Sequence, residues 1–476
     1  MSLKKRTLKN LRAVVVAQML ALGFSQLGLL ILAGILPPTD FGIYAAIMVV
    51  YNLAIVISTL GVDQAAIQSK DETDAAIGTG ATIRILVTVV SGVVMVLIAT
   101  PVASFFGNPE IANPLRIMSI VLVVSSLGFV STIRMTRELR FVELSISRVA
   151  YALIWPSVAV VAAVLGLSYW SFVAGFLLGN LVTLVILLHF SPWNFKLKPD
   201  RGVGRRLLMF GRFTVATSLV VYMVFNLDKV VIGRIVGGDE LGVYFLAFSF
   251  GTIIPTMFTN VVNSVMFPTY ARISEDRALL KEAYRRTLVY LAYVSMPMGV
   301  GLAAISSTFV DSILGPEWVG AAVPLAVLSF VGLASSMTSP AGSLFLAMGK
   351  PEIAWRISII LLIPYLVLLV PAAAFFGIVG VSILMLAQTM ISLIWVLIVA
   401  SKLTDVGSGT IFRDLLRPTA PAAIMGMCIL AASMVLPPTI PSLAGLVGLG
   451  ILIYAAGAHF ASHGTIIREF ASMIRP

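Results

Sequence analysis

The chain has 476 residues, of which 59% are hydrophobic and only 11% are charged, and its mean hydropathy is +1.03. This composition excludes an ordinary soluble domain and indicates an integral membrane protein. The net charge of +11 does not call for a nucleic-acid partner, because the basic residues lie in short segments beside apolar stretches, where anionic lipid headgroups attract them.

The predicted elements are apolar helices, each long enough to cross a hydrocarbon core of roughly 30 Å, which takes about twenty residues. The first apolar stretch is too long for the core of a cleavable signal peptide, so we expect it to be retained as the first helix. The gaps leave no room for a soluble domain. In chain order, the sequence predicts about fourteen helices, near 13-36, 41-62, 82-105, 113-133, 147-166, 169-190, 209-236, 241-267, 288-309, 319-347, 354-375, 378-401, 418-436 and 440-461.

The gap before the ninth helix has a pattern of its own. Residues 274-288 repeat apolar side chains at near-helical spacing, although Ser274 is not followed three residues later by a glutamate that would complete a capping box. We predict a short amphipathic helix along the inner membrane face. The alternative is a binding arm for a partner enzyme. The apolar positions are Ala278, Leu279, Ala283 and Leu288.

Basic residues concentrate in alternate gaps, which is the pattern of the positive-inside rule. It predicts a multi-pass protein of the cytoplasmic membrane with both termini in the cytosol. Three basic residues do not fit this pattern: Arg116, Lys229 and Arg234. The gaps expected in the cytosol hold Lys4, Lys5, Arg6, Lys9, Arg12, Arg134, Arg137, Arg140, Lys196, Lys198, Arg201, Arg205, Arg206, Arg272, Arg277, Lys281, Arg285 and Arg286. The opposite gaps hold Asp40, Glu110, Asp239, Glu240, Asp311 and Glu317.

The chain contains an internal repeat. A shift of 200 residues superimposes the outer turn at 32-46 on that at 232-246, with Ile, Gly and Tyr identical at 35/235, 42/242 and 44/244. FFGNPE at 105-110 resembles ILGPEW at 313-318, and Gly166 matches Gly377. An even number of helices per repeat predicts parallel repeats about an axis along the membrane normal, with a central cleft between two six-helix lobes. The expected division is 1-195, 196-402, and two added helices in 403-476.

The seventh helix carries polar residues inside its apolar stretch, at Asn226, Asp228 and Lys229. At 1.5 Å per residue, Asp228 lies about 24 Å along the helix from Arg212, in the outer half of the membrane. Charged groups at such a depth are expected to face the protein interior or a wet cavity. Because Asp228 and Lys229 are adjacent, they project about 100° apart, and we expect each to meet a different partner.

Two interpretations of these charges stay open. In the functional one, Asp228 binds a proton or cation in a cavity and Lys229 meets an anionic substrate. In the structural one, they form an ion pair with another helix or Lys229 snorkels to the interface. Arg84 and Arg148 begin helices on the cytosolic side, where snorkelling can anchor them, and Arg116 begins the fourth helix on the outer side. If some of these arginines face the cleft, its field is positive.

Residues that carry redox or metal chemistry are scarce. The single cysteine, Cys428, lies in an apolar stretch, and His189, His459 and His463 form no ligand set. No GxxxxGK[ST] motif is present, so we expect no cofactor and no nucleotide-driven step, and coupling to a gradient of H⁺ or Na⁺ is the expectation instead.

Several segments together resemble the Wzx-type polysaccharide and O-antigen flippases of the multidrug/oligosaccharidyl-lipid/polysaccharide exporter superfamily. These are the basic N-terminal segment, PPTDFGIY at 37-44, FGRF at 210-213, the 226-244 stretch and VMFPTY at 265-270. The resemblance implies a flippase, not an enzyme, that moves a polyprenyl-diphosphate-linked oligosaccharide outward by alternating access. It implies that Asp228 matches the acidic residue of the family's seventh helix, and that cationic residues meet the diphosphate or acidic sugars.

The resemblance also implies partners, namely membrane lipids, the lipid-linked oligosaccharide, and the polysaccharide polymerase and glycosyltransferases that act on the same sugars. Two alternatives stay open. One is a cation-coupled multidrug exporter of the same superfamily, which predicts an acidic cleft. The other is a membrane-embedded polysaccharide polymerase or ligase, which would need catalytic groups in a substantial outer loop.

Overall fold

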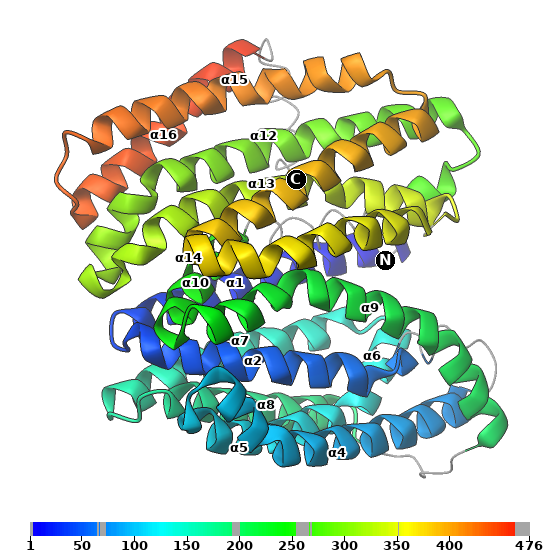
Figure 1. Cartoon of the computed structure of the whole chain (residues 1–476). Helices are drawn as coiled ribbons and strands as arrows, with labels where there is room; N and C mark the ends of the chain where they lie inside the picture. Colours follow the sequence, from blue (N-terminus) through cyan, green and yellow to red (C-terminus); the bar gives the residue numbers. More distant parts are fainter. Residues whose placement is uncertain are drawn as a thin grey trace. The chain divides into compact units, whose positions relative to one another are not determined.

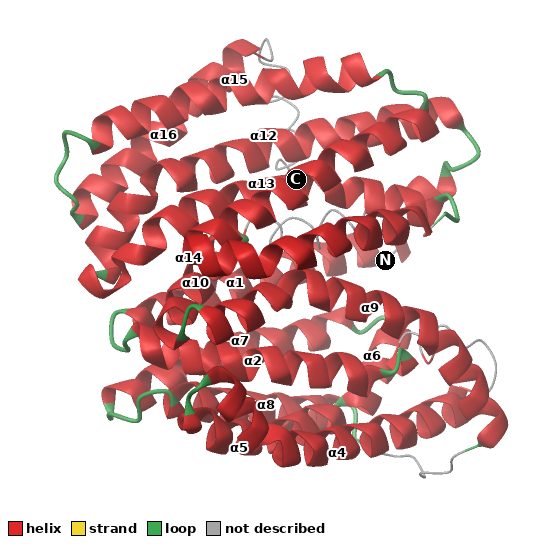
Figure 2. Cartoon of the chain, in the orientation of Figure 1, coloured by secondary structure: helices red, strands yellow, loops and turns green. Residues whose placement is uncertain are grey.

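The computed structural model describes residues 3–63, 66, 73–192, 200–253, 266, 269–350 and 352–461. In these residues the regular elements are all helices, joined by short loops (Figures 1 and 2). They are α1 (Leu3–Ala33), α2 (Pro38–Thr59), α4 (Thr73–Phe106), α5 (Ala112–Leu127), α6 (Phe129–Arg137), α7 (Phe141–Val164), α8 (Trp170–Phe190), α9 (Arg201–Ile235), α10 (Gly238–Gly251), α12 (Arg277–Phe309), α13 (Ala322–Ala347), α14 (Glu352–Thr404), α15 (Ser408–Ser433) and α16 (Ile440–Ala461).

Twelve helical segments in the described part of the chain are long and apolar enough to cross a membrane. This confirms an all-α membrane protein. The expected total of about fourteen stays a prediction, for two reasons. The segment α14 contains two of the expected helices, which meet at the non-helical Gly377 (φ 57°, ψ −148°). The helix expected near 241-267 begins as α10, and most of its remainder lies outside the described residues.

The chain divides into two compact units, Met1–Gly242 and Val243–Pro476. In the first unit, α7 packs against α1 and α8, α4 packs against α5, and α9 lies against α2 and α4. In the second, α12 packs against α13, α15 and α16, and α13 packs against α14. Packing therefore groups α9 with the first unit. The boundaries expected from the repeat describe sequence relationship rather than packing, and they stay a prediction.

The segment expected to form a separate amphipathic helix is instead the beginning of α12. Asp276 caps this helix, since its Oδ1 accepts the backbone N–H groups of Ala278 and Leu279, each at 3.0 Å. The helix then continues without a break to Phe309. The prediction of a separate helix was wrong because the apolar stripe that matters is Leu280, Tyr284 and Leu288, which is buried and runs directly into the membrane-spanning part.

Two of the sequence similarities between the repeats have matching backbone conformations. Gly107 (φ 69°) and Gly315 (φ 92°) follow the third helix of each repeat, and each precedes a short 3-10 turn containing Pro-Glu. Gly166 (φ 83°) and Gly377 (φ 57°) lie at the corresponding later turns. Positive φ favours glycine because a Cβ would clash with the backbone. The repeated glycines thus mark the same chain reversals in both repeats.

The two similar outer turns of the repeat are in direct contact within the first unit. A Cβ on Gly42 would lie 2.0 Å from the carbonyl oxygen of Gly238, and one on Gly242 would lie 1.9 Å from that of Pro38. Thr39 Oγ1 donates a hydrogen bond of 2.7 Å to Asp239 Oδ1 across the same turns. The outer turns of the two repeats therefore cross with backbone against backbone.

A bidentate ion pair joins α12 to α15 in the second unit. Arg285 Nε lies 2.5 Å from Asp414 Oδ2, and Arg285 Nη2 lies 3.2 Å from Asp414 Oδ1. The Asp414 side chain is 3% exposed, whereas that of Arg285 is 34% exposed. Paired contacts between a guanidinium and a carboxylate combine charge with fixed geometry. Neither residue stood out in the sequence.

Asp414→Ala should destabilise the protein by about 1–3 kcal/mol, because the half-buried guanidinium of Arg285 loses the Asp414 carboxylate as a charged partner. Thermal unfolding in detergent measures this as a lower melting temperature. Arg277→Ala is the matched control, since the Arg277–Asp405 pair is exposed on both sides and should contribute little. Equal melting temperatures for the two variants would contradict the role given to Asp414.

Candidate functional site

The central feature of α9 is a buried ion pair between adjacent residues. The side chain of Asp228 is fully buried and that of Lys229 is 6% exposed. Lys229 Nζ lies 3.4 Å from Asp228 Oδ1 and donates a hydrogen bond of 2.6 Å to the carbonyl oxygen of Phe225. The expectation that the two residues would avoid pairing was therefore wrong.

The backbone explains why neighbours on a helix meet here. Asp228 Oδ1 also accepts the backbone N–H of Lys229 at 2.9 Å, which holds the carboxylate close to the helix. Helical side chains lean toward the N-terminus, and the long lysine folds back one turn onto the carbonyl of Phe225. The partners of the ammonium thus include one carboxylate oxygen and one neutral carbonyl.

Two contacts to other helices, made by Tyr222 and Arg234, fix this part of α9 within the first unit, whereas Asn226 bonds within α9 itself. Asn226 Nδ2 donates to the carbonyl oxygen of Tyr222 at 3.0 Å, and Tyr222 Oη donates to the carbonyl oxygen of Val49 on α2 at 2.5 Å. Beyond the pair, Arg234 Nη1 donates to the carbonyl oxygen of Phe105 at 2.9 Å. The buried charges therefore lie on a helix that is fastened to α2 on one side of them and to α4 on the other.

The other two basic residues that break the charge pattern have structural partners at helix ends. The Arg234 guanidinium binds the last turn of α4 and lies 5.5 Å from the centre of the Phe105 ring. Arg116 is exposed on α5, where Nη1 donates to Asn113 Oδ1 at 2.6 Å and Nη2 donates to Thr100 Oγ1 at 2.9 Å. Of the three exceptions, Lys229 is the one with a buried charge.

Arg84 has a partner that the sequence did not suggest. Its side chain is 11% exposed on α4, and its Nη1 lies 3.6 Å from Asp63 Oδ1. It therefore does not reach outward as a snorkelling anchor. Burial raises the pKa of the Asp63 carboxyl, and the charge of Arg84 partly offsets that effect. Asp63 follows Leu60 and Gly61, which both have a left-handed backbone.

The six candidate residues thus have different settings. Asp228 and Lys229 are paired, and Asn226 lies half-buried on the same helix. Arg84 lies beside Asp63, Arg116 binds Asn113 and Thr100, and Arg148 is exposed on α7. Within the described ranges, no group of three or more His, Cys, Asp or Glu residues is placed to hold a metal ion. Chemically, this arrangement keeps one buried ammonium group and one buried carboxylate group side by side in a membrane-spanning helix.

Comparison with known proteins identifies the family of this chain. Residues 31–324 match the family described as polysaccharide biosynthesis protein, a range that includes Asp228 and Lys229. The lipopolysaccharide biosynthesis protein WzxC of Escherichia coli (strain K12) is 25% identical over 388 residues, covering 80% of this chain and 78% of WzxC. The succinoglycan biosynthesis transport protein ExoT of Rhizobium meliloti (strain 1021) is 25% identical over 312 residues, covering 65% of this chain and 62% of ExoT.

Among solved structures, the lipid II flippase MurJ in an inward closed conformation has the same fold. The TM-score is 0.79 at 16% sequence identity, and the match covers 96% of this chain and 100% of the MurJ chain. These matches confirm the resemblance inferred from the sequence segments. The chain belongs to the polysaccharide biosynthesis protein family.

Proposed function

We propose that this protein is a flippase that moves a polyprenyl-diphosphate-linked oligosaccharide across the cytoplasmic membrane by alternating access. The names of the relatives support it, because WzxC is a lipopolysaccharide biosynthesis protein and ExoT is a transport protein of succinoglycan biosynthesis. The fold supports it as well, since MurJ is a lipid II flippase. The observation that carries the proposal is the buried Asp228–Lys229 pair inside a membrane-spanning helix of this fold.

The chemistry of the pair suits an anionic headgroup. A diphosphate offers oxygens that can replace the carboxylate and carbonyl oxygens around Lys229 Nζ. When the ammonium turns to the substrate, Asp228 needs a new positive partner in the low-dielectric interior. A proton or Na⁺ would fill that need, which links substrate binding to an ion gradient. In this proposal Asn226 adds a polar contact, and Arg84 with Asp63 forms a second charged group of the same unit.

The orientation belongs to the same proposal. The multi-pass membrane location is supported by the apolar helices, and the alternating basic gaps support an orientation with both termini in the cytosol. Arg116 and Arg148 are exposed and stay predictions as cleft residues. The substrate would come from glycosyltransferases on the cytosolic side, and a polysaccharide polymerase would consume it outside.

The multidrug exporter has less support. It calls for an acidic cleft, whereas the carboxylate of Asp228 is already balanced by Lys229. The relatives also bear names from polysaccharide biosynthesis rather than drug efflux. A polymerase or ligase has less support too, because ExoT is named a transport protein and MurJ a flippase.

Loss of the protein should leave lipid-linked oligosaccharide in the inner leaflet, because its sugar headgroup cannot cross the hydrocarbon core unaided. The measurement is the amount of that lipid in membranes from cells with and without the gene, together with its accessibility to a glycosidase added to right-side-out vesicles. Accumulation of an inaccessible lipid is expected. Unchanged lipid levels with greater drug sensitivity would favour the exporter instead.

A further inference from the structure

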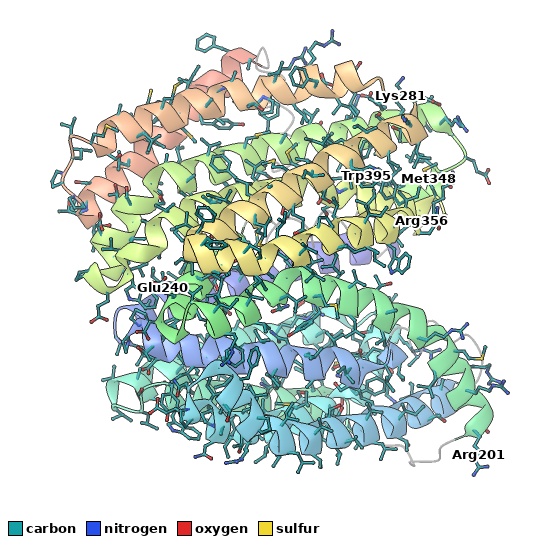
Figure 3. The ribbon with its side chains drawn as sticks, viewed as in Figure 1. Arg201, Glu240, Lys281, Met348, Arg356 and Trp395 are labelled. Atoms are coloured by element: carbon teal, nitrogen blue, oxygen red, sulfur yellow. The ribbon has the colours of Figure 1, made fainter. Side chains whose placement is uncertain are left out.

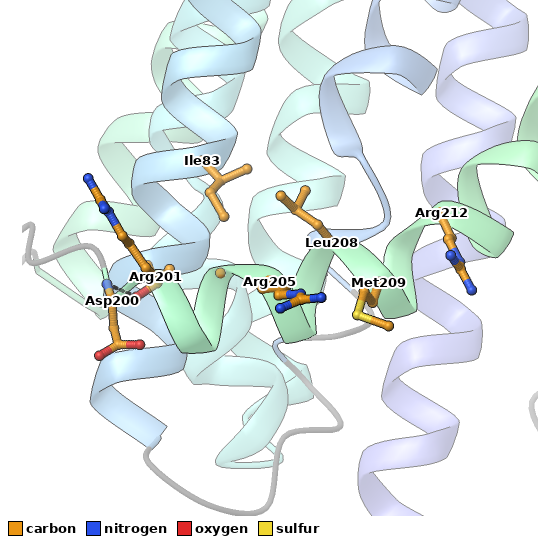
Figure 4. Close-up of a pocket in the computed structure, with 9 residues that line it drawn as sticks. Ile83, Asp200, Arg201, Arg205, Leu208, Met209 and Arg212 are labelled. Carbon is orange, nitrogen blue, oxygen red and sulfur yellow. Dashed lines mark hydrogen bonds between the residues drawn. The ribbon is translucent and has the colours of Figure 1, made fainter.

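The N-terminal part of α9 and the facing part of α4 border an open surface cavity of about 530 Å³ within the first unit (Figure 4). Arg201, Arg205 and Arg212 line it from α9. Leu208 and Met209 of α9 and Ile83 of α4 add apolar side chains to the same lining. The proposed transport chemistry does not use this cavity.

The arginines lie where α9 has not yet entered its membrane-spanning part. Arg201 is in the first turn of the helix (Figure 3), and the apolar span begins at Thr214. Arg201 and Arg205 are four residues apart and both are exposed, and Figure 4 shows their side chains extending in different directions from α9. The charge pattern of the sequence places this end of α9 in the cytosol. In the proposed orientation, the cavity lies at the level of the lipid headgroups of the inner leaflet.

The single carboxylate among the lining residues is already engaged. Asp200 Oδ1 accepts the backbone N–H of Val203 at 2.8 Å and so caps α9. The backbone N–H of Asp200 donates to Thr79 Oγ1 of α4 at 3.0 Å, which joins the two walls of the cavity. With three arginines against one capping carboxylate, the lining keeps a positive charge beside apolar side chains.

We propose that this cavity binds the headgroup of an anionic phospholipid of the inner leaflet. The flexible side chains of Arg201 and Arg205 would turn toward the phosphate, and the first part of an acyl chain would cover Leu208, Met209 and Ile83. Basic pockets between membrane helices on the cytosolic side are suited to such headgroups, because each arginine adds attraction for a phosphate. The bound lipid would stabilise the packing of α9 against α4. The inference rests on the proposed orientation but not on the proposed transport activity.

A lipid-borne phosphate could also belong to the polyprenyl-diphosphate substrate, and a bare phosphate ion offers the same charge. The phospholipid is favoured because the lining joins arginines to apolar side chains, with Thr79 and Asp200 as its other polar side chains. A free anion would gain nothing from Leu208 or Met209. A substrate site would need groups that recognise sugar hydroxyls.

The test is native mass spectrometry of the full-length protein in detergent, titrated with phosphatidylglycerol, phosphatidylcholine of equal chain length, a polyprenyl diphosphate and inorganic phosphate. Arg201→Gln with Arg205→Gln should weaken phosphatidylglycerol binding roughly tenfold. Arg201→Lys with Arg205→Lys should keep most of it, because the charge remains. Arg272→Gln with Arg356→Gln removes the same charge from exposed places in the second unit and should leave binding unchanged.

Four results would overturn the proposal. The first is equal phosphatidylglycerol binding by the glutamine double variant and the matched control. The second is binding of phosphatidylcholine that is as tight and as sensitive to the substitutions. The third is displacement of phosphatidylglycerol by inorganic phosphate at equal phosphate concentration. The fourth is preferential binding of the polyprenyl diphosphate, which would assign the cavity to the substrate. Elution of each variant as the native species in size-exclusion chromatography checks that it is folded.

Discussion

Asp228→Asn should leave the protein inserted in the membrane, at an abundance lowered by the loss of the carboxylate beside Lys229, and should reduce export per molecule at least roughly tenfold, which corresponds to a transport barrier raised by about 1.4 kcal/mol. Insertion is kept because asparagine retains an oxygen that can accept from the backbone and ammonium groups of Lys229. Export falls because asparagine cannot take up a proton or balance the ammonium. Surface polysaccharide per cell, divided by the amount of membrane protein, measures the effect.

The double variant Asp228→Asn with Lys229→Gln distinguishes the functional from the structural interpretation. It removes both charges together, so it avoids the penalty of about 3–5 kcal/mol that an uncompensated buried charge carries. If the pair only supports folding, the double variant should be as abundant and as active as the wild type. We expect it to be abundant and inactive. Full export by the double variant would remove the transport role proposed for the pair.

Gly42→Ala and Gly242→Ala should each disrupt the crossing of the outer turns, at a stability loss of at least about 1–3 kcal/mol. The added Cβ would lie 2.0 Å from the carbonyl oxygen of Gly238 in one variant and 1.9 Å from that of Pro38 in the other. These are backbone atoms, so no side-chain rotation can relieve the overlap. Lower melting temperature in detergent and lower export per molecule are the expected results.

Gly23→Ala is the matched control for this pair of variants. A Cβ at Gly23 meets nothing within 4 Å, and the residue lies inside α1. Alanine there should be neutral or should stabilise the helix by roughly 0.5–1 kcal/mol. If Gly42→Ala and Gly23→Ala have the same melting temperature, the outer crossing is not a close contact of the folded protein.

Most helix positions could be predicted because the bilayer sets their length and the apolar stretches match it. Helix beginnings were predicted less well. The periodic pattern in 274-288 was identified, but hydropathy could not show that the same helix continues through Leu288 into the next span. The start of the helix is signalled by Asp276, an N-cap residue, and not by a capping box that begins at Ser274.

The candidate site was predicted by residue type but not by geometry. A lone acidic residue and a lysine inside an apolar helix mark an unusual place, and the structure places both in the interior. Their mutual contact depends on side-chain rotamers and on the Phe225 carbonyl, which spacing along a helix does not reveal. Asp63 and Asp414 were missed because each meets its arginine only through the packing of distant helices.

The contact between the outer turns at Gly42 and Gly242 has a consequence for how such a chain could arise. With the repeat offset of 200 residues, Gly242 is the counterpart of Gly42 and Gly238 is the counterpart of Pro38. Position 42 of each repeat therefore touches position 38 of the other, and a contact in which the same two positions meet reciprocally is isologous. An isologous patch is self-complementary, so a single six-helix chain carrying this turn could pair with its own copy. Duplication and fusion would then join two subunits that already fitted one another, without the need for a new interface.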